Sequence, residues 1–143
     1  MSELGYNTNL ASEFYVLSAL HRLGADAVLT LGNKKSVDIV VVRGPGDVVT
    51  VDVKGLAGKT AWPIDNVKVA VDNHYLVFVC YQGKIATLDF QPEVWVIPSA
   101  ELHRVTYHAP GGLRVVQRSK LLAEAQQYHN AWELIAAKAQ PLV

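Results

Sequence analysis

Residues 36–54 read SVDIVVVRGPGDVVTVDVK and decide the expected fold. Two apolar runs, 36–42 and 48–54, are rich in β-branched residues and are long enough for strands but too short for helices. Between them lies RGPGD at 43–47, a cluster that is typical of a tight turn. The stretch therefore predicts an antiparallel hairpin.

The same hairpin predicts which residues face each other. If residues 44–46 form the loop, the residues on either side of it pair, and the register places Asp38 opposite Asp52. Side chains alternate along a strand, so Lys54 shares the face of Asp52. Two facing carboxylates repel each other, and a divalent cation between them with a lysine nearby would relieve that repulsion.

Two other interpretations of these residues stay open at this point. Either aspartate could face solvent, with Lys54 forming a surface ion pair to one of them. A loop one residue longer or shorter would also place Asp38 and Asp52 on opposite faces of the hairpin.

The composition indicates a single globular domain. The chain has 143 residues, of which 50% are hydrophobic and 18% are charged, and this length can bury a substantial core. No apolar run approaches the roughly 20 residues that span a bilayer, and the N-terminus lacks a signal-peptide pattern, so we expect a cytoplasmic protein. The formal net charge is zero, which argues against a protein that contacts many phosphates unless its charge is unevenly placed.

Cysteine and histidine offer little recognisable chemistry. The single cysteine, Cys80, excludes an internal disulfide and lies in an apolar run, so we expect a small buried residue. The histidines show no metal-ligand spacing, and we expect most of them on the surface or in packing roles.

A helix is expected over residues 10–23, with Asn9 as its N-cap and Gly24 just after its end. At about 100° per residue, an apolar stripe forms on this helix. Glu13 falls inside that stripe. It either has a partner on the core side or reaches water from the first turn. The stripe consists of Leu10, Phe14, Leu17, Leu20 and Leu23.

The remaining pattern completes one α/β (α+β) domain with a mixed central sheet, an N-terminal helix and a long C-terminal helix. The expected strands are 27–31, 75–81, 85–90, 94–97 and an edge strand at 113–116. Ser99 is expected to cap a short helix through residue 103, and Ser119 a long last helix to about residue 139.

The order of helix, strand and Asp…Asp-x-Lys hairpin resembles the PD-(D/E)XK nuclease superfamily, which includes restriction endonucleases and Holliday junction resolvases. The matching residues are Glu13, Asp38, Asp52 and Lys54. Val37 stands where the proline of the name would be. The resemblance covers roughly residues 5–80 and implies a restriction-endonuclease-like αβββαβ core at about 5–98, followed by an extension at about 99–143.

The resemblance implies a metal-dependent nuclease that hydrolyses phosphodiester bonds in DNA. Asp38, Asp52 and Glu13 would hold Mg²⁺ or Mn²⁺, with the carbonyl of Val53 as a further oxygen. Lys54 would orient or deprotonate the attacking water, or stabilise charge in the transition state. A homodimer is also compatible with the resemblance, since dimers are common among nucleases that cut both strands.

Three competing functions stay open. The chain could be a catalytically inactive PD-(D/E)XK-fold protein that binds nucleic acid or a protein partner. It could be a dimeric interaction protein, with Trp95 and the 119–139 helix at the interface. It could also be an unrelated α/β enzyme whose site has another composition.

Overall fold

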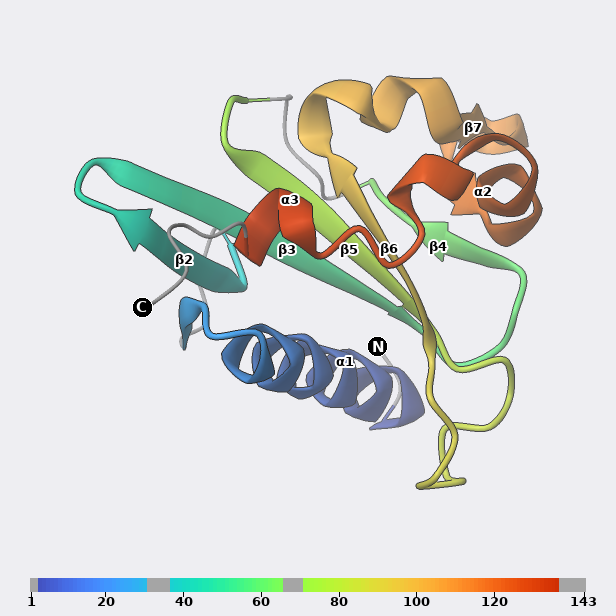
Figure 1. Cartoon of the computed structure of the whole chain (residues 1–143). Coiled ribbons are helices and arrows are strands. Elements are labelled where there is room, and N and C mark those ends of the chain that lie inside the picture. Colours follow the sequence, from blue (N-terminus) through green and yellow to red (C-terminus); the bar gives the residue numbers. More distant parts are fainter. Residues whose placement is uncertain (1–2, 31–36, 66–70, 137–143) are drawn as a thin grey trace.

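The computed structural model describes residues 3–30, 37–65 and 71–136, and its centre is a five-stranded mixed sheet (Figure 1). In spatial order the strands are β1 (Asp26–Leu29), β2 (Ile39–Gly44), β3 (Asp47–Leu56), β5 (His74–Cys80) and β6 (Glu93–Pro98). Neighbouring strands are antiparallel except for β3 and β5, which are parallel. The expected fold class, an α/β domain around a mixed sheet, is confirmed.

The β2–β3 hairpin has the predicted register. The regular pairs are Ile39–Val51, Val40–Thr50, Val41–Val49 and Val42–Val48. The turn is shorter than expected, because Gly44 pairs with Asp47 and the register shifts just before Gly44. Arg43 occupies the irregular position, and its guanidinium forms an ion pair with the Asp47 carboxylate at 3.1 Å. A two-residue turn with one irregular residue thus gives the register that a three-residue loop would give.

Helix α1 (Glu3–Arg22) begins well before the expected start, so the prediction of Asn9 as its N-cap is wrong. The expected end is confirmed. Gly24 has a φ of +84°, and the amide of Ala25 donates to the carbonyl of Leu20 at 2.9 Å, as in a glycine-terminated helix.

The buried face of α1 differs from the expected apolar stripe. It consists of Thr8, Ser12, Val16 and Leu20. Phe14 and Leu23, two members of the expected stripe, are 52% and 54% exposed. The reason lies on β3, where Gly55 has no side chain and the small Thr8 and Ser12 pack closely over it. Close packing of this kind buries the N-terminal turns and favours a longer helix.

A second layer covers the other face of the sheet. It contains β4 (Ala61–Pro63), the 3₁₀ helix η1 (Ser99–Val105), β7 (Thr106–His108), β8 (Arg114–Gln117) and α2 (Arg118–Glu124). The three strands form a small sheet in the order β4-β8-β7. The strand expected near 113–116 is therefore central to its sheet and not an edge strand.

Neither expected serine cap is found. The Ser99 hydroxyl accepts the Val71 amide at 3.1 Å, so it joins the start of η1 to the segment before β5. Ser119 lies inside α2, which follows Gln117 without a side-chain cap.

The long helix expected over 119–139 is wrong within the described residues. After α2 come a single 3₁₀ turn (Gln126–Tyr128) and a short α3 (Glu133–Ala136). Asn130 has a φ of +55°, and its amide donates to the carbonyl of Val94 on β6 at 2.9 Å. Contacts with the sheet have replaced the helical hydrogen bonds that the amphipathic pattern predicts.

This C-terminal segment passes along the outer edge of β6, where His129 forms an isolated bridge with Trp95. Its apolar residues then enter two different cores. Leu121 and Ala125 pack in the second layer. Ala131 and Ile135 pack with α1 on the opposite face.

The strand expected at 85–90 is also wrong. The chain there makes successive turns, because the amides of Lys84, Thr87 and Phe90 each donate to the carbonyl three residues earlier. Leu88, which would be buried in a strand, is 95% exposed.

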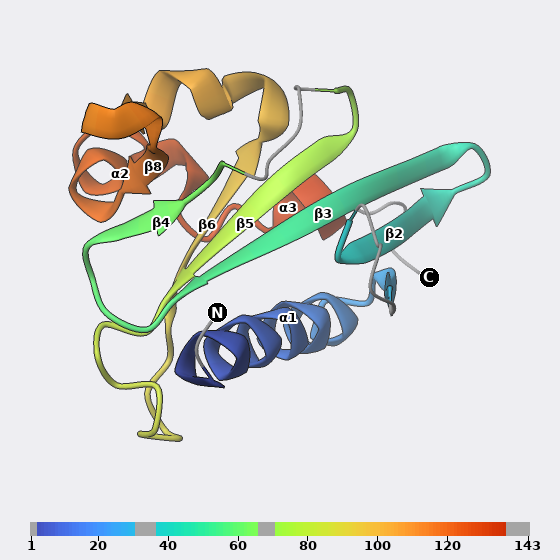
Figure 2. The same ribbon diagram turned by 180° about the vertical axis from the view of Figure 1, so that it is seen from behind.

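The two faces of the sheet have different environments (Figures 1 and 2). One face packs against α1 and α3, and the other packs against the second layer. In both views the β2–β3 turn projects away from the second layer. No helix joins β3 to β5 in residues 57–65 and 71–73, where the expected αβββαβ core has one. No helix in the described ranges is long and apolar enough to cross a membrane.

Candidate functional site

Asp38 lies directly before the first residue of β2, beside the middle of β3. Its amide donates to the carbonyl of Val51 at 2.9 Å, and its Oδ2 accepts the amide of Val53 at 2.7 Å. Asp38 is therefore anchored to the residues on both sides of Asp52. The regular ladder begins at the next residue, with the pair Ile39–Val51, so the Asp38 carboxylate takes the place of a backbone acceptor for the Val53 amide.

Asp52 and Lys54 share one face of β3, as the alternation predicts. Val51 and Val53 pack in the core on the α1 side, so Asp52 and Lys54 point to the other face. Both are half-buried. They lie in register with Leu76 and Phe78 of β5, which belong to the second-layer core. The two polar residues thus lie at the border of that core.

The Asp52 carboxylate has a partner that the sequence did not indicate. Its Oδ2 lies 2.9 Å from Nε2 of His74, the first residue of β5. His74 is only 7% exposed, and it pairs with Thr50 across the parallel ladder. The only sequence signal was a histidine directly before an apolar strand, and the parallel pairing that brings it to Asp52 is not local.

Lys54 is held in an unusual electrostatic environment. Burial lowers the pKa of Lys54, and the nearby carboxylates of Asp52 and then Asp38 partly oppose that effect. The charges of both aspartates therefore act on the same ammonium group. The repulsion expected between the two carboxylates is reduced by this lysine and by His74.

Glu13 lies beside this segment from the opposite side of the sheet. Ser12 of α1 contacts Gly55 of β3. Glu13 is the residue after Ser12, and Lys54 is the residue before Gly55. Glu13 is half-buried, between the core face of α1 and solvent.

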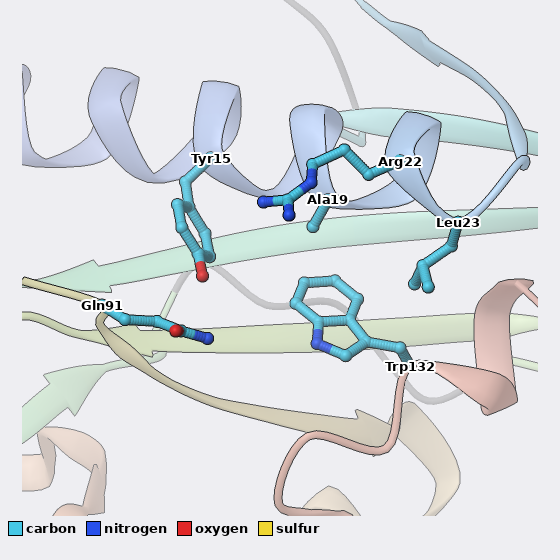
Figure 3. A pocket seen from close by; sticks show the side chains of 6 residues that line it. All are labelled: Tyr15, Ala19, Arg22, Leu23, Gln91 and Trp132. Carbon is cyan, nitrogen blue, oxygen red and sulfur yellow. The ribbon is translucent and has the colours of Figure 1, made fainter. Parts of the chain in front are cut away.

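A pocket of about 250 Å³ lies along one flank of α1, and Glu13 does not line it. Figure 3 shows the pocket lining, with the Arg22 guanidinium extending toward the Tyr15 ring. The lining residues are Tyr15, Ala19, Arg22, Leu23, Gln91 and Trp132. Glu13 and Tyr15 are about 200° apart around the helix, so Glu13 lies on the flank away from this pocket.

The donor atoms of Asp38 and Asp52 are of the kind that a hard divalent cation binds. Each carboxylate has a second oxygen, and the Val53 carbonyl points toward the β2 side of β3, as the amide of that residue does. Carboxylate and carbonyl oxygens are the ligands that Mg²⁺ and Mn²⁺ take. Within residues 3–30, 37–65 and 71–136, however, no three His, Cys, Asp or Glu side chains form a group that could hold a metal ion. The set of Asp38, Asp52 and Glu13 stays a prediction.

The chain has a structural match among known proteins. No protein-family model matches it, and no curated protein matches its sequence. Among solved structures, it is similar to a bacterial homing endonuclease, I-Ssp6803I, with a TM-score of 0.56 at 15% identity. The match covers 90% of this chain and 88% of that chain. The chain therefore has the fold of a structure that was solved as a homing endonuclease.

Proposed function

We propose that the protein is a metal-dependent endonuclease that hydrolyses phosphodiester bonds in DNA. One observation carries the proposal: Asp38, Asp52 and the half-buried Lys54 interact electrostatically at the point where β2 stops pairing with β3. Two carboxylates that can hold a metal ion and a lysine of lowered pKa are groups that can catalyse phosphodiester hydrolysis. The fold shared with I-Ssp6803I supports the same assignment.

The aspartates would hold the metal ion. Asp38 and Asp52 would each offer a carboxylate oxygen to Mg²⁺ or Mn²⁺, and the Val53 carbonyl would offer a third. When bound, such an ion neutralises charge on the phosphate and lowers the pKa of a coordinated water. Glu13 lies on the α1 side of β3, away from the face of Asp52 and Lys54, so it would join the site through a water molecule and not as a direct partner of Asp52.

Lys54 would handle the proton and the charge of the reaction. Because burial lowers the pKa of Lys54, a larger fraction of it is neutral near pH 8 than for a surface lysine. In the neutral form it would accept a proton from the attacking water. In the charged form it would stabilise the negative charge that develops on the phosphate.

DNA is the proposed partner. The formal net charge is zero, so the overall attraction between the chain and DNA phosphates is weak. A homodimer would compensate, because two sites on one duplex raise the effective concentration of each. We therefore propose a dimer that cuts both strands.

A second candidate is a nuclease-fold protein that binds nucleic acid or a protein partner without cutting. The observation that favours it is that both aspartates already have hydrogen-bond partners within the protein. Asp38 accepts the Val53 amide, and Asp52 is bonded to His74. Those bonds reduce the repulsion between the carboxylates without a metal ion.

One experiment separates the two candidates. Mg²⁺ and Mn²⁺ are titrated by calorimetry into wild type, Asp52→Asn and the control Asp89→Asn, with plasmid cleavage measured in parallel. Asp89 is exposed and lies in the turns between β5 and β6. Binding and cleavage that are lost only in Asp52→Asn support the nuclease. Metal binding without cleavage favours the binding protein, and the absence of metal binding in wild type overturns the proposed metal site.

A further inference from the structure

His74 is buried at the start of β5, and within the proposed site it contacts Asp52. Its side chain is 7% exposed, and its Nε2 lies 2.9 Å from Oδ2 of Asp52. Asp38 approaches β3 from the β2 side, whereas β5 lies on the other side of β3. Asp52 is therefore held by a residue of β5, whereas Asp38 approaches β3 from its other neighbour, β2.

The direction of this hydrogen bond follows from the carboxylate, whose oxygen accepts while the ring N–H donates, and the second ring nitrogen of His74 agrees with it. Nδ1 is buried and has no hydrogen-bond partner in the described part of the chain. A proton on Nδ1 would be a buried donor without an acceptor, which is unfavourable. The ring that fits this environment carries its proton on Nε2 and donates it to Asp52.

The bond leaves the other carboxylate oxygen available. Within the described residues, Oδ2 is the oxygen of Asp52 that is in a hydrogen bond, and Oδ1 is in none. Asp52 is thus oriented by one oxygen and can present the other.

From these contacts we infer that His74 is a positioning residue for Asp52, a role that rests on the proposed metal site. It holds Oδ2 on the β5 side, so that Oδ1 is directed to the cation between Asp52 and Asp38. Histidine and carboxylate partners of this kind orient metal ligands in many proteins, and their loss weakens metal binding by about 10- to 100-fold. His74 itself contacts neither the cation nor the DNA.

The test is Mn²⁺ binding by calorimetry to wild type, His74→Leu, His74→Gln and Thr50→Val, without DNA. His74→Leu removes the hydrogen-bond donor and puts an apolar side chain of similar size in its place. His74→Gln keeps an N–H at nearly the same distance from Asp52. Thr50→Val changes the neighbour in register with His74 and leaves the pair intact. Circular dichroism and thermal unfolding establish that each variant is folded.

We expect His74→Leu to bind Mn²⁺ about 10- to 100-fold more weakly, and His74→Gln and Thr50→Val to bind within a few-fold of wild type. A second readout needs no metal: nitrogen NMR of the wild-type ring should show the proton on Nε2. Equal Mn²⁺ affinity in His74→Leu and wild type, or a ring protonated on Nδ1 alone, overturns the positioning role. If wild type itself binds no Mn²⁺, the proposed metal site is what fails, and the role fails with it.

Discussion

Ser12 of α1 lies directly over Gly55 of β3, so closely that a Cβ atom at position 55 would clash with the Ser12 hydroxyl oxygen. The carbonyl oxygen of Thr8 would lie 3.0 Å from that Cβ atom. This contact fixes the distance between the helix that carries Glu13 and the strand that carries Lys54. The glycine after the lysine is therefore required for the packing of the helix on the sheet.

Gly55→Ala should destabilise the protein by about 1–3 kcal/mol, because the methyl group must push α1 away from β3. The matched control is Gly58→Ala, where a Cβ atom meets nothing within 4 Å. Chemical denaturation of both variants measures the effect. Equal stability of the two variants would show that α1 adjusts without cost.

Lys54→Met should reduce plasmid cleavage by about 100-fold or more while the fold becomes no less stable. The proposed proton transfer needs the amine. The folded state does not, since burial of the charged form is unfavourable enough to lower the pKa of Lys54 despite two nearby aspartates. Lys59→Met, which removes an exposed lysine from the next loop, is the control. A Lys54→Met protein that cuts as fast as wild type would refute the role given to Lys54.

The stability of the metal-free protein should depend on pH through the same lysine. Because the pKa of Lys54 is lower in the folded state than its ordinary value of 10.5, the unfolded chain binds more protons between the two values. The free energy of unfolding contributed by Lys54 therefore rises with pH across that window and is constant below it. The difference between wild type and Lys54→Met, measured by urea unfolding with a chelator from pH 7 to 10.5, isolates this contribution. A difference that falls with rising pH would contradict the assignment.

Cys80 should react with thiol reagents at least about a hundredfold more slowly in the folded protein than in the unfolded chain. Its side chain is 0% exposed, its Sγ donates to the Gly58 carbonyl at 3.2 Å, and burial raises the pKa of the thiol. Alkylation followed by mass spectrometry, with and without denaturant, measures the ratio. Rapid labelling under native conditions would mean that β5 separates from the loop after β3.

The sequence predicted the hairpin well because its information is local. Alternating apolar residues and a short glycine-containing turn fix the register between β2 and β3, and Gly24 fixes the end of α1. These features depend on residues close together in the chain. The arrangement of Asp38 around Asp52 followed from them.

The errors have a common cause in contacts between distant segments. Helical periodicity after residue 118 is real, but its apolar residues pack on two faces of the sheet. The helix therefore ends at Glu124, and the chain turns again at Asn130, where φ is +55°. The pairing of His74 with Asp52 depends on a parallel strand 22 residues away. Its geometry follows from how β5 returns to the sheet, which no local pattern specifies.

The bridge between Trp95 and His129 has a further consequence for association between molecules. The C-terminal segment occupies the open edge of β6, and the amide of Asn130 already uses a carbonyl on that edge. A strand from another chain cannot readily add there. Within the described residues, β1 at the far end of the sheet has a neighbour on one side alone. Growth of the central sheet by edge-to-edge pairing, whether in an assembly or in an aggregate, is therefore directed to β1.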